Sequence, residues 1–198
     1  MKILRDSSEE EMVLAFLQGE IRSHRFREDI LKALREQGTD EALITEGDIG
    51  NASENALRAA VLGAFRGYPD REIFQDYPAN VQWKYVEFAE EDLKDLCYIS
   101  YSYWDEISKG TRKPVEAAKT VLAGEEIFGV SNQYFLDGSE KLRAGEHFPP
   151  IILLTDSPER YVLVEGHCRA TCYAMVPGSF AGTNGYVGFC AEGALASW

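Results

Sequence analysis

Apolar side chains recur every three or four positions through the first seventy residues, which is the period of an amphipathic helix. A first helix is predicted to begin at Ser7–Glu10, where hydroxyl groups precede acidic ones. A second helix is predicted to end near Gly38, and a third to run from Ser53 to Gly67. The apolar positions that define the three helices are Met12, Val13, Phe16, Leu17, Ile21, Ile30, Leu31, Leu34, Leu57, Ala60, Val61, Ala64 and Phe65. We therefore expect a helical N-terminal region, residues 1–79.

The pattern changes after Pro78 to the alternating and continuous apolar runs of β-strands. Residues 81–88 mix aromatic and β-branched side chains with partial alternation, as in a half-buried strand. Residues 151–154 and 161–164 are continuous apolar runs separated by a polar turn, and residues 186–190 are predicted as a further strand. This part of the chain is therefore expected to contain a small sheet.

Helices are predicted between these strands. Pro114 stands at the first position of one, where proline costs least, and others are expected at residues 132–144 and 169–175. Residues 98–104 are rich in aromatic side chains but show no clear period. The sequence thus predicts an α/β (α+β) protein, in which residues 80–198 form a small mixed sheet flanked by helices.

Acidic residues outnumber basic ones in both parts of the chain. The 33 acidic and 20 basic side chains give a net charge of −13, and the segments before and after residue 80 are both net negative. DNA-binding proteins usually present a basic face, because phosphate contacts dominate their affinity. Non-specific DNA binding is therefore disfavoured, whereas a small basic pocket is compatible with this composition.

Other features predict a cytoplasmic protein. Residues 1–11 lack the apolar core of a signal peptide, and no apolar run approaches the roughly 18 residues of a membrane span. The cysteines are Cys97, Cys168, Cys172 and Cys190. They are too few for a disulfide framework in a chain of 198 residues, which fits a reducing compartment.

The most informative segment is Glu165-Gly166-His167-Cys168-Arg169, in which a predicted buried strand ends, turns at glycine and leads into a helix. Free backbone N–H groups at a helix start favour an anion. Arg169 can add a bidentate clamp on phosphate or carboxylate. Glu165 is placed to act as a general base or to hold a metal ion beside that anion.

This segment resembles the signature of the ParB/sulfiredoxin-like superfamily. In that group an apolar strand is followed by a turn and by a second strand that ends in Gly-Glu-Arg-Arg, Gly-Cys-His-Arg or Asp-Gly-His-His-Arg. Residues 149–154, Pro-Pro-Ile-Ile-Leu-Leu, match the first strand, and residues 165–169 look closest to the form of the ADP-dependent free-serine kinases. The resemblance covers about residues 80–198, and it implies that Glu165, His167 and Arg169 lie at the phosphates of a nucleotide.

Departures from the family pattern narrow what the resemblance implies. His167 stands where sulfiredoxins place the reactive cysteine, so sulfinic-acid reduction is not expected. The Gly-Glu-Arg-Arg form of the chromosome-partitioning members is absent, as are a basic surface and an evident helix-turn-helix. Compared with the Asp-Gly-His-His-Arg form of the kinases, this chain has Glu165 in place of the aspartate and Cys168 in place of the second histidine.

A second candidate is the loop Ser108-Lys109-Gly110-Thr111-Arg112, which precedes the helix at Pro114. Superfamily members place a polar, arginine-bearing loop after the first strand, against the nucleotide. With Thr111 as a helix cap and Arg112 beside it, this loop is predicted to bind a second phosphate, together with Ser108. The same residues also fit an ordinary exposed helix start.

Structural roles compete with each of these functional ones. Glu165 and Arg169, four residues apart, would also form a capping ion pair, and His167 would also serve as a packed structural histidine. The last three cysteines with His167 suggest a zinc site, but buried packing is the more common role for such cysteines.

Residues outside the motif carry weaker predictions. The aromatic side chains of residues 98–104 would stack a nucleobase or, more commonly, pack in the core. Arg58 and Arg66 would reach a phosphate if their helix covers the pocket, but solvent exposure is expected for both.

Together these observations predict a nucleotide-dependent enzyme, a phosphotransferase or an NTPase. Arg169, Arg112 and the backbone of residues 166–168 would hold the phosphates of ATP, ADP or CTP, beside a small-molecule acceptor. Glu165 would act as base or Mg²⁺ ligand, and His167 would orient or protonate a phosphoryl oxygen. A divalent cation would help a polyanionic nucleotide to bind an acidic protein.

Two alternatives belong to other functional classes. A non-catalytic module would use the pocket to sense a ligand and the N-terminal helices to contact a partner protein or a second copy. A nuclease, the activity after which some ParB-like domains are labelled, is disfavoured by the acidic charge and by the lack of a clear cluster of metal-binding acids. Neither nucleic acid nor a membrane is an expected partner.

Overall fold

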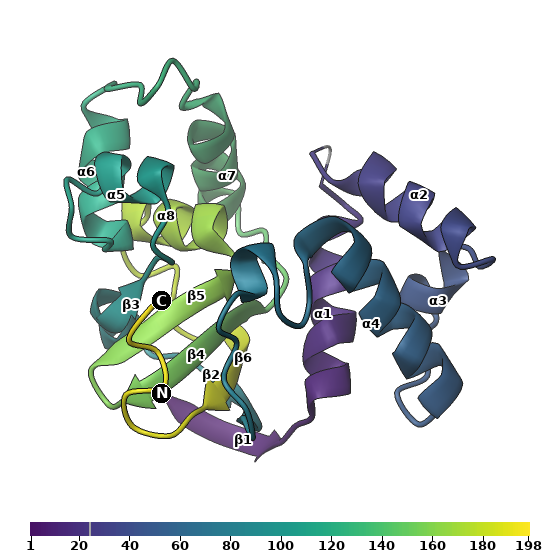
Figure 1. The fold of residues 1–198 in the computed structure, drawn as a ribbon. Coiled ribbons are helices and arrows are strands. Elements are labelled where there is room, and N and C mark those ends of the chain that lie inside the picture. The colour runs from purple at the N-terminus through teal and green to yellow at the C-terminus, as the bar shows by residue number, and fades with distance from the viewer. Residues whose placement is uncertain (24) are drawn as a thin grey trace. The chain divides into compact units, whose positions relative to one another are not determined.

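The computed structural model describes residues 1–23 and 25–198 and divides the chain into two compact units (Figure 1). One unit is helical and comprises Ser7–Trp83. The other carries the sheet and comprises Met1–Asp6 together with Lys84–Trp198. The first residues of the chain, predicted as part of the helical region, thus supply a strand to the sheet instead.

The strands of the sheet unit are β1 (Lys2–Asp6), β2 (Gln82–Glu87), β3 (Leu96–Cys97), β4 (Ile151–Ser157), β5 (Arg160–Glu165) and β6 (Asn184–Phe189). In the described chain these six strands form one sheet in the order β1-β2-β6-β4-β5-β3. The pairs β1–β2 and β4–β5 are antiparallel, whereas β4–β6 and β3–β5 are parallel. The mixed sheet with its flanking helices confirms the predicted α/β (α+β) class.

The helices of the sheet unit are α5 (Ser102–Ile107), α6 (Pro114–Leu122), α7 (Gln133–Arg143) and α8 (His167–Met175), with a 3₁₀ helix at Glu90–Asp95. Helix α8 packs against both α6 and α7, and the four α-helices lie together in Figure 1. The buried side chains that they share include Ala117, Val121, Phe135, Leu142, Ala170 and Tyr173. Because α8 begins directly after β5, this packing fixes the position of the helix N-terminus at the end of that strand.

The helical unit consists of α1 (Glu9–Glu20), α2 (Arg27–Glu36), α3 (Ala42–Thr45), α4 (Ala52–Arg66) and a 3₁₀ helix at Glu72–Phe74. The helices predicted from the apolar period are confirmed as α1, α2 and α4. The Ser8 side chain accepts a hydrogen bond from the Glu11 amide and caps α1, and Asn51 caps α4 in the same manner. The core of this unit includes Met12, Phe16, Leu17, Ile30, Leu34, Val61 and Leu62.

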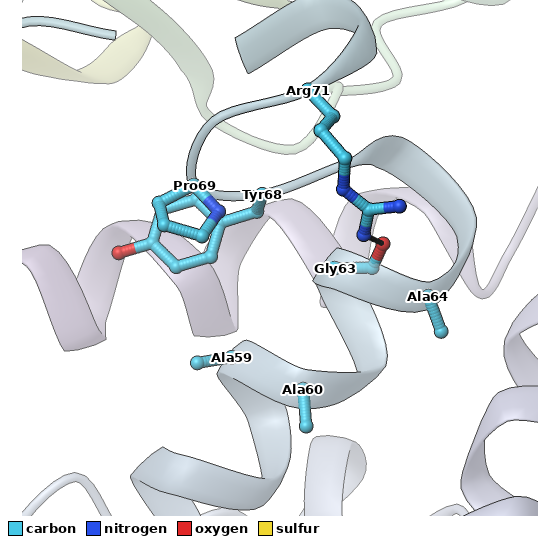
Figure 2. Close-up of a pocket in the computed structure, with 7 residues that line it drawn as sticks. All are labelled: Ala59, Ala60, Gly63, Ala64, Tyr68, Pro69 and Arg71. Atoms are coloured by element: carbon cyan, nitrogen blue, oxygen red, sulfur yellow. Dashed lines mark hydrogen bonds between the residues drawn. The ribbon is translucent and has the colours of Figure 1, made fainter. Parts of the chain in front are cut away.

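The surface of α4 carries a shallow pocket of about 540 Å³ within the helical unit (Figure 2). It is lined by Ala59, Ala60, Gly63, Ala64, Tyr68, Pro69 and Arg71. The Tyr68 hydroxyl donates to Glu9, and burial raises the pKa of Tyr68 above its ordinary value. The Arg71 guanidinium donates to the Gly63 carbonyl oxygen at 3.3 Å. Both polar groups are therefore engaged within the unit, and the remaining lining is a stripe of small side chains.

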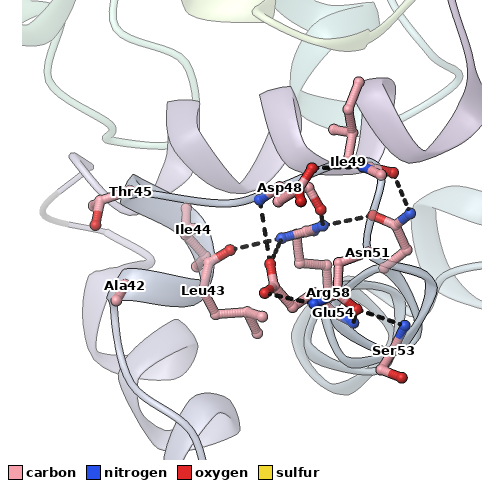
Figure 3. A network of polar contacts seen from close by, with 12 residues as sticks. Ala42, Leu43, Ile44, Thr45, Asp48, Ile49, Asn51, Ser53, Glu54 and Arg58 are labelled. Atoms are coloured by element: carbon pink, nitrogen blue, oxygen red, sulfur yellow. Dashed lines mark hydrogen bonds and ion pairs between the residues drawn. The ribbon is translucent and has the colours of Figure 1, made fainter.

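Arg58 on α4 lies in the interior of the helical unit (Figure 3), where its side chain is 0 % exposed. The guanidinium donates to the carbonyl oxygens of Leu43 at 3.0 Å and Asp48 at 2.7 Å, and it pairs with the Glu54 carboxylate at 3.1 Å. The predicted solvent exposure of Arg58 is wrong because these acceptors replace its hydration. Arg66, for which solvent exposure was also predicted, is half-buried.

Candidate functional site

The two segments singled out from the sequence lie at one edge of the sheet. Strands β3 and β5 are parallel, with Leu96 opposite Tyr161 and Cys97 opposite Val162. The carboxyl ends of parallel neighbours meet at the same edge, which is where open α/β sheets commonly bind ligands. Strand β5 leads there into the Glu165–Arg169 segment, and β3 leads into the connection that contains residues 108–112.

Gly166 makes the turn from β5 into α8 with a backbone that other residues avoid. Its φ is +102°, and a Cβ atom at this position would lie 2.6 Å from Cγ2 of Ile151. The Gly166 carbonyl oxygen accepts the first helical hydrogen bond, from Ala170 N at 2.8 Å. Within the described chain no side chain caps α8, so the first amides of the helix are not used by a capping residue.

Glu165 and Arg169 bind each other across the start of α8. Their carboxylate and guanidinium form an ion pair, and both side chains are 11 % exposed. The same guanidinium donates to the carbonyl oxygens of Pro149 and Pro150, the latter at 2.8 Å. These two residues therefore form the ion pair that was considered as their structural alternative, but neither side chain caps α8, and Arg169 also ties the segment before β4 to the helix.

His167 belongs to a cluster of nearly parallel aromatic rings. Its ring centre lies 5.8 Å from that of Tyr98 and 5.1 Å from that of Trp104, with interplanar angles of 15° and 22°. Tyr98 is buried, and its hydroxyl shares a 2.7 Å hydrogen bond with the hydroxyl of Thr171 on α8. Ring packing thus fixes the orientation of His167, as expected of a structural histidine, and its predicted part in catalysis stays a prediction.

In the second segment, residues 108–112, the side-chain hydroxyl groups form hydrogen bonds within the loop itself. Ser108 is buried, and its hydroxyl donates to the Trp104 carbonyl oxygen at 2.6 Å and accepts from Arg112 N at 2.8 Å. The Thr111 hydroxyl donates to the Ser108 carbonyl oxygen at 2.8 Å. The N-cap of α6 is Lys113, so the expectation that Thr111 caps this helix is wrong. The helix begins two residues later than a Thr111 cap would require, and the Thr111 hydroxyl accepts from the Lys113 amide instead.

Arg112 is the cationic side chain that this loop leaves available. Its backbone adopts φ +56°, a left-handed conformation that costs a non-glycine residue about 1–2 kcal/mol. Its carbonyl oxygen accepts a 2.8 Å hydrogen bond from Tyr98 N, which places Arg112 beside the residue that follows β3. The half-buried guanidinium makes no hydrogen bond or ion pair with any described residue. A strained backbone that presents an unpaired cation is typical of a ligand-binding position.

The cysteines do not assemble with His167 into a metal site. Cys172 packs against α7, where its Sγ lies 3.6 Å from the Phe135 carbonyl oxygen, and burial raises the pKa of this thiol to about 12. Burial likewise raises the pKa of Cys190 to about 11. Across residues 1–23 and 25–198, no three His, Cys, Asp or Glu side chains form a metal-binding group.

Mg²⁺ was expected to bind through Glu165. Mg²⁺ requires several oxygen ligands in octahedral geometry. The Glu165 carboxylate is already paired with Arg169, and one such carboxylate does not fit a dedicated magnesium site.

Sequence reasoning considered Tyr98 and Trp104 only as weak candidates for stacking a nucleobase, and it missed the backbone groups that hold Arg169. Tyr98 and Trp104 come from the aromatic-rich segment for which no element was predicted, because β3 is only two residues long and shows no period. The carbonyl oxygens of Pro149 and Pro150 hold Arg169, but a backbone carbonyl carries no residue-type signal. The signal in the sequence for the ring cluster was the aromatic-rich run of residues 98–104, directly after the apolar pair Leu96-Cys97.

Comparisons were made with protein-family models, with curated proteins and with solved structures, and none of them matches this chain. Among the described helices, none is both long and apolar enough to cross a membrane. The resemblance to the ParB/sulfiredoxin-like superfamily therefore rests on the residues of its motif and remains a prediction.

Proposed function

We propose that the sheet edge at the ends of β3 and β5 binds the phosphates of a nucleotide, and that the protein is a nucleotide-dependent phosphotransferase or NTPase. The observation that carries the proposal is the position of Arg112. Its half-buried guanidinium lacks an intramolecular partner within the described chain, and it stands beside Tyr98, whose ring contacts His167 at the start of α8. An anion at this edge would meet both a cation and the amides of a helix N-terminus.

Phosphate binding has a specific consequence for Glu165 and Arg169. A phosphate competes with the Glu165 carboxylate for the same guanidinium, because each presents two oxygens that accept a bidentate pair of hydrogen bonds from arginine. When Arg169 turns to a phosphate, Glu165 loses its partner and becomes available to accept a proton from an attacking hydroxyl or water. Phosphoryl transfer depends mainly on positioning and charge neutralisation, which two arginines and a helix N-terminus supply.

A second candidate function is a non-catalytic sensor of the same ligand. The ion pair between Glu165 and Arg169 favours it, since a carboxylate held by a guanidinium is a poor general base. In that case the exchange of partners at Arg169 would signal ligand binding through Pro149 and Pro150, which precede β4.

Replacing Glu165 by glutamine distinguishes the two functions. Glutamine keeps the shape of the side chain but cannot accept a proton, so turnover is expected to fall at least about 100-fold while nucleotide affinity is retained. The measurement is steady-state phosphate release or transfer beside isothermal titration of the same sample. If the wild-type protein binds nucleotide without turnover, the sensor is the correct function.

Replacing Arg112 by glycine tests the binding site itself without damaging the fold. Glycine adopts φ +56° freely, so the free energy of unfolding should stay within about 1 kcal/mol of wild type. A lost charge-assisted hydrogen bond should weaken nucleotide binding by at least about 10-fold. Isothermal titration with ATP, ADP, CTP and GTP measures this, and Arg143→Ala, at an exposed arginine in the last turn of α7, is the matched control. Equal affinity of Arg112→Gly and wild type, or no binding of any nucleotide, would contradict the proposal.

A further inference from the structure

The indole of Trp104 has one face covered by other rings. The Trp104 ring centre lies 4.6 Å from that of Tyr98 and 5.1 Å from that of His167, and these two are 5.8 Å from each other. Rings stacked on opposite faces of an indole would be at least about 7 Å apart, twice the van der Waals spacing of about 3.5 Å. Tyr98 and His167 therefore share the same face of Trp104.

No aromatic ring of the described residues stacks on the opposite face of Trp104. Tyr103 meets the indole edge-on, with ring centres 5.0 Å apart and an interplanar angle of 80°, so it provides a wall and not a stacked layer. Trp104 is half-buried, whereas Trp83 and Trp198 are 3 % and 6 % exposed. Trp104 is thus the most exposed of the three tryptophans.

A single hydroxyl connects this ring to the proposed phosphate loop. The Ser108 hydroxyl donates to the Trp104 carbonyl oxygen and accepts from the Arg112 amide, so the two backbones are one side chain apart. In a nucleotide, a ribose separates the base from the phosphates. A phosphate at Arg112 therefore leaves the base within reach of the indole.

We infer that Trp104 is the stacking platform for the base of the nucleotide, with Tyr103 as the side wall of the subsite. This inference rests on the proposed function and adds which part of the ligand each segment recognises. A planar base stacks on the accessible indole face, and the Tyr98–His167 layer supports the indole from behind. Stacking on an aromatic side chain tolerates different bases, because every base has a π-face. The ligand class is accordingly a nucleoside polyphosphate, with purines favoured by their larger stacking area.

The test compares ATP with inorganic tripolyphosphate on the full wild-type chain, by isothermal titration and tryptophan fluorescence. Both ligands carry the phosphates, but only ATP carries a base. We expect tripolyphosphate to bind without changing tryptophan emission, and ATP to bind about 10-fold more tightly while quenching it. Because Trp83 and Trp198 are buried, the quenching would come from Trp104.

Two variants assign the effect to this ring. Trp104→Leu should reduce the affinity for ATP to that for tripolyphosphate and leave tripolyphosphate binding unchanged, whereas Trp104→Phe should retain most of the difference. If wild-type protein binds ATP and tripolyphosphate with equal affinity and ATP causes no quenching, the inference is overturned, but the proposed phosphate site is not. Failure of both ligands to bind would overturn the proposed function and the inference with it. The wild-type comparison holds even if a variant does not fold.

Discussion

Replacing Arg58 by methionine is expected to lower the free energy of unfolding by about 3 kcal/mol. The fully buried guanidinium satisfies the carbonyl oxygens of Leu43 and Asp48; methionine would leave that of Leu43 without this donor and that of Asp48 with only the Asn51 amide, at 3.2 Å. The Glu54 carboxylate, whose side chain is 33 % exposed, would keep part of its hydration, which limits the cost of losing its partner. The main effect is therefore the loss of hydrogen bonds that hold the connection between α3 and α4, and not the exposure of a buried charge.

Urea unfolding followed by circular dichroism measures this effect. Arg35→Met, at an exposed arginine on α2 of the same unit, is the control and should change stability by no more than about 0.5 kcal/mol. Arg58→Lys should behave like Arg58→Met, since a single ammonium group cannot reach both carbonyl oxygens and the carboxylate as the guanidinium fork does. Equal stability of the Arg58 and Arg35 variants would show that the buried network contributes nothing.

Replacing Gly166 by alanine is expected to destabilise the sheet unit by about 3 kcal/mol. The backbone at φ +102° costs an alanine about 1–2 kcal/mol, and the contact of its Cβ with Ile151 adds a similar amount. Because Ile151 is buried and β-branched, part of the strain is relieved by moving the start of α8 away from β4. Nucleotide affinity should therefore fall together with stability, because the first amides of the helix move with it.

Gly178→Ala separates the cost of the left-handed backbone from the cost of the contact with Ile151. Gly178 also has a left-handed backbone, at φ +85°, but an added Cβ there would meet no atom within 4 Å. This variant should cost only the backbone term, about 1 kcal/mol. Thermal unfolding of both variants, and of Gly166→Ala combined with Ile151→Ala, isolates the contact. If the cost of Gly166→Ala is the same in the presence and absence of Ile151, steric crowding is not its source.

The longer elements with a buried face were predictable from the sequence, whereas the two-residue strand β3 and the exposed strand β1 were not. Helices α1 and α4 and strands β4 and β5 each bury a face, so apolar residues recur with the period of the element. Strand β1 is exposed along its whole length at the edge of the sheet, and its residues therefore carry no alternation. Its place in the sheet depends on pairing with β2, about eighty positions along the chain.

The candidate site shows the same division between local and distant causes. The ion pair of Glu165 with Arg169 follows from a spacing of four residues and was considered from the sequence as the structural alternative to a phosphate site. The ring cluster instead joins Tyr98 to His167, 69 positions along the chain. Outside the site, the burial of Arg58 in the helical unit likewise depends on carbonyl oxygens 10 and 15 positions away. Such contacts depend on how the elements pack, so the residue types alone did not reveal them.

The chain leaves the sheet unit and returns to it at adjacent positions. Asp6 of β1 lies opposite Lys84 of β2, and their side chains form an ion pair at 2.6 Å. The whole helical unit is therefore an insert within one β-hairpin, not a module joined in series. Its coding segment could be lost, lengthened or exchanged without changing the strand order, and a two-residue Asn-Gly turn is the simplest closure of the hairpin that remains. Chains that share this sheet would then differ most in the stretch between their first two strands.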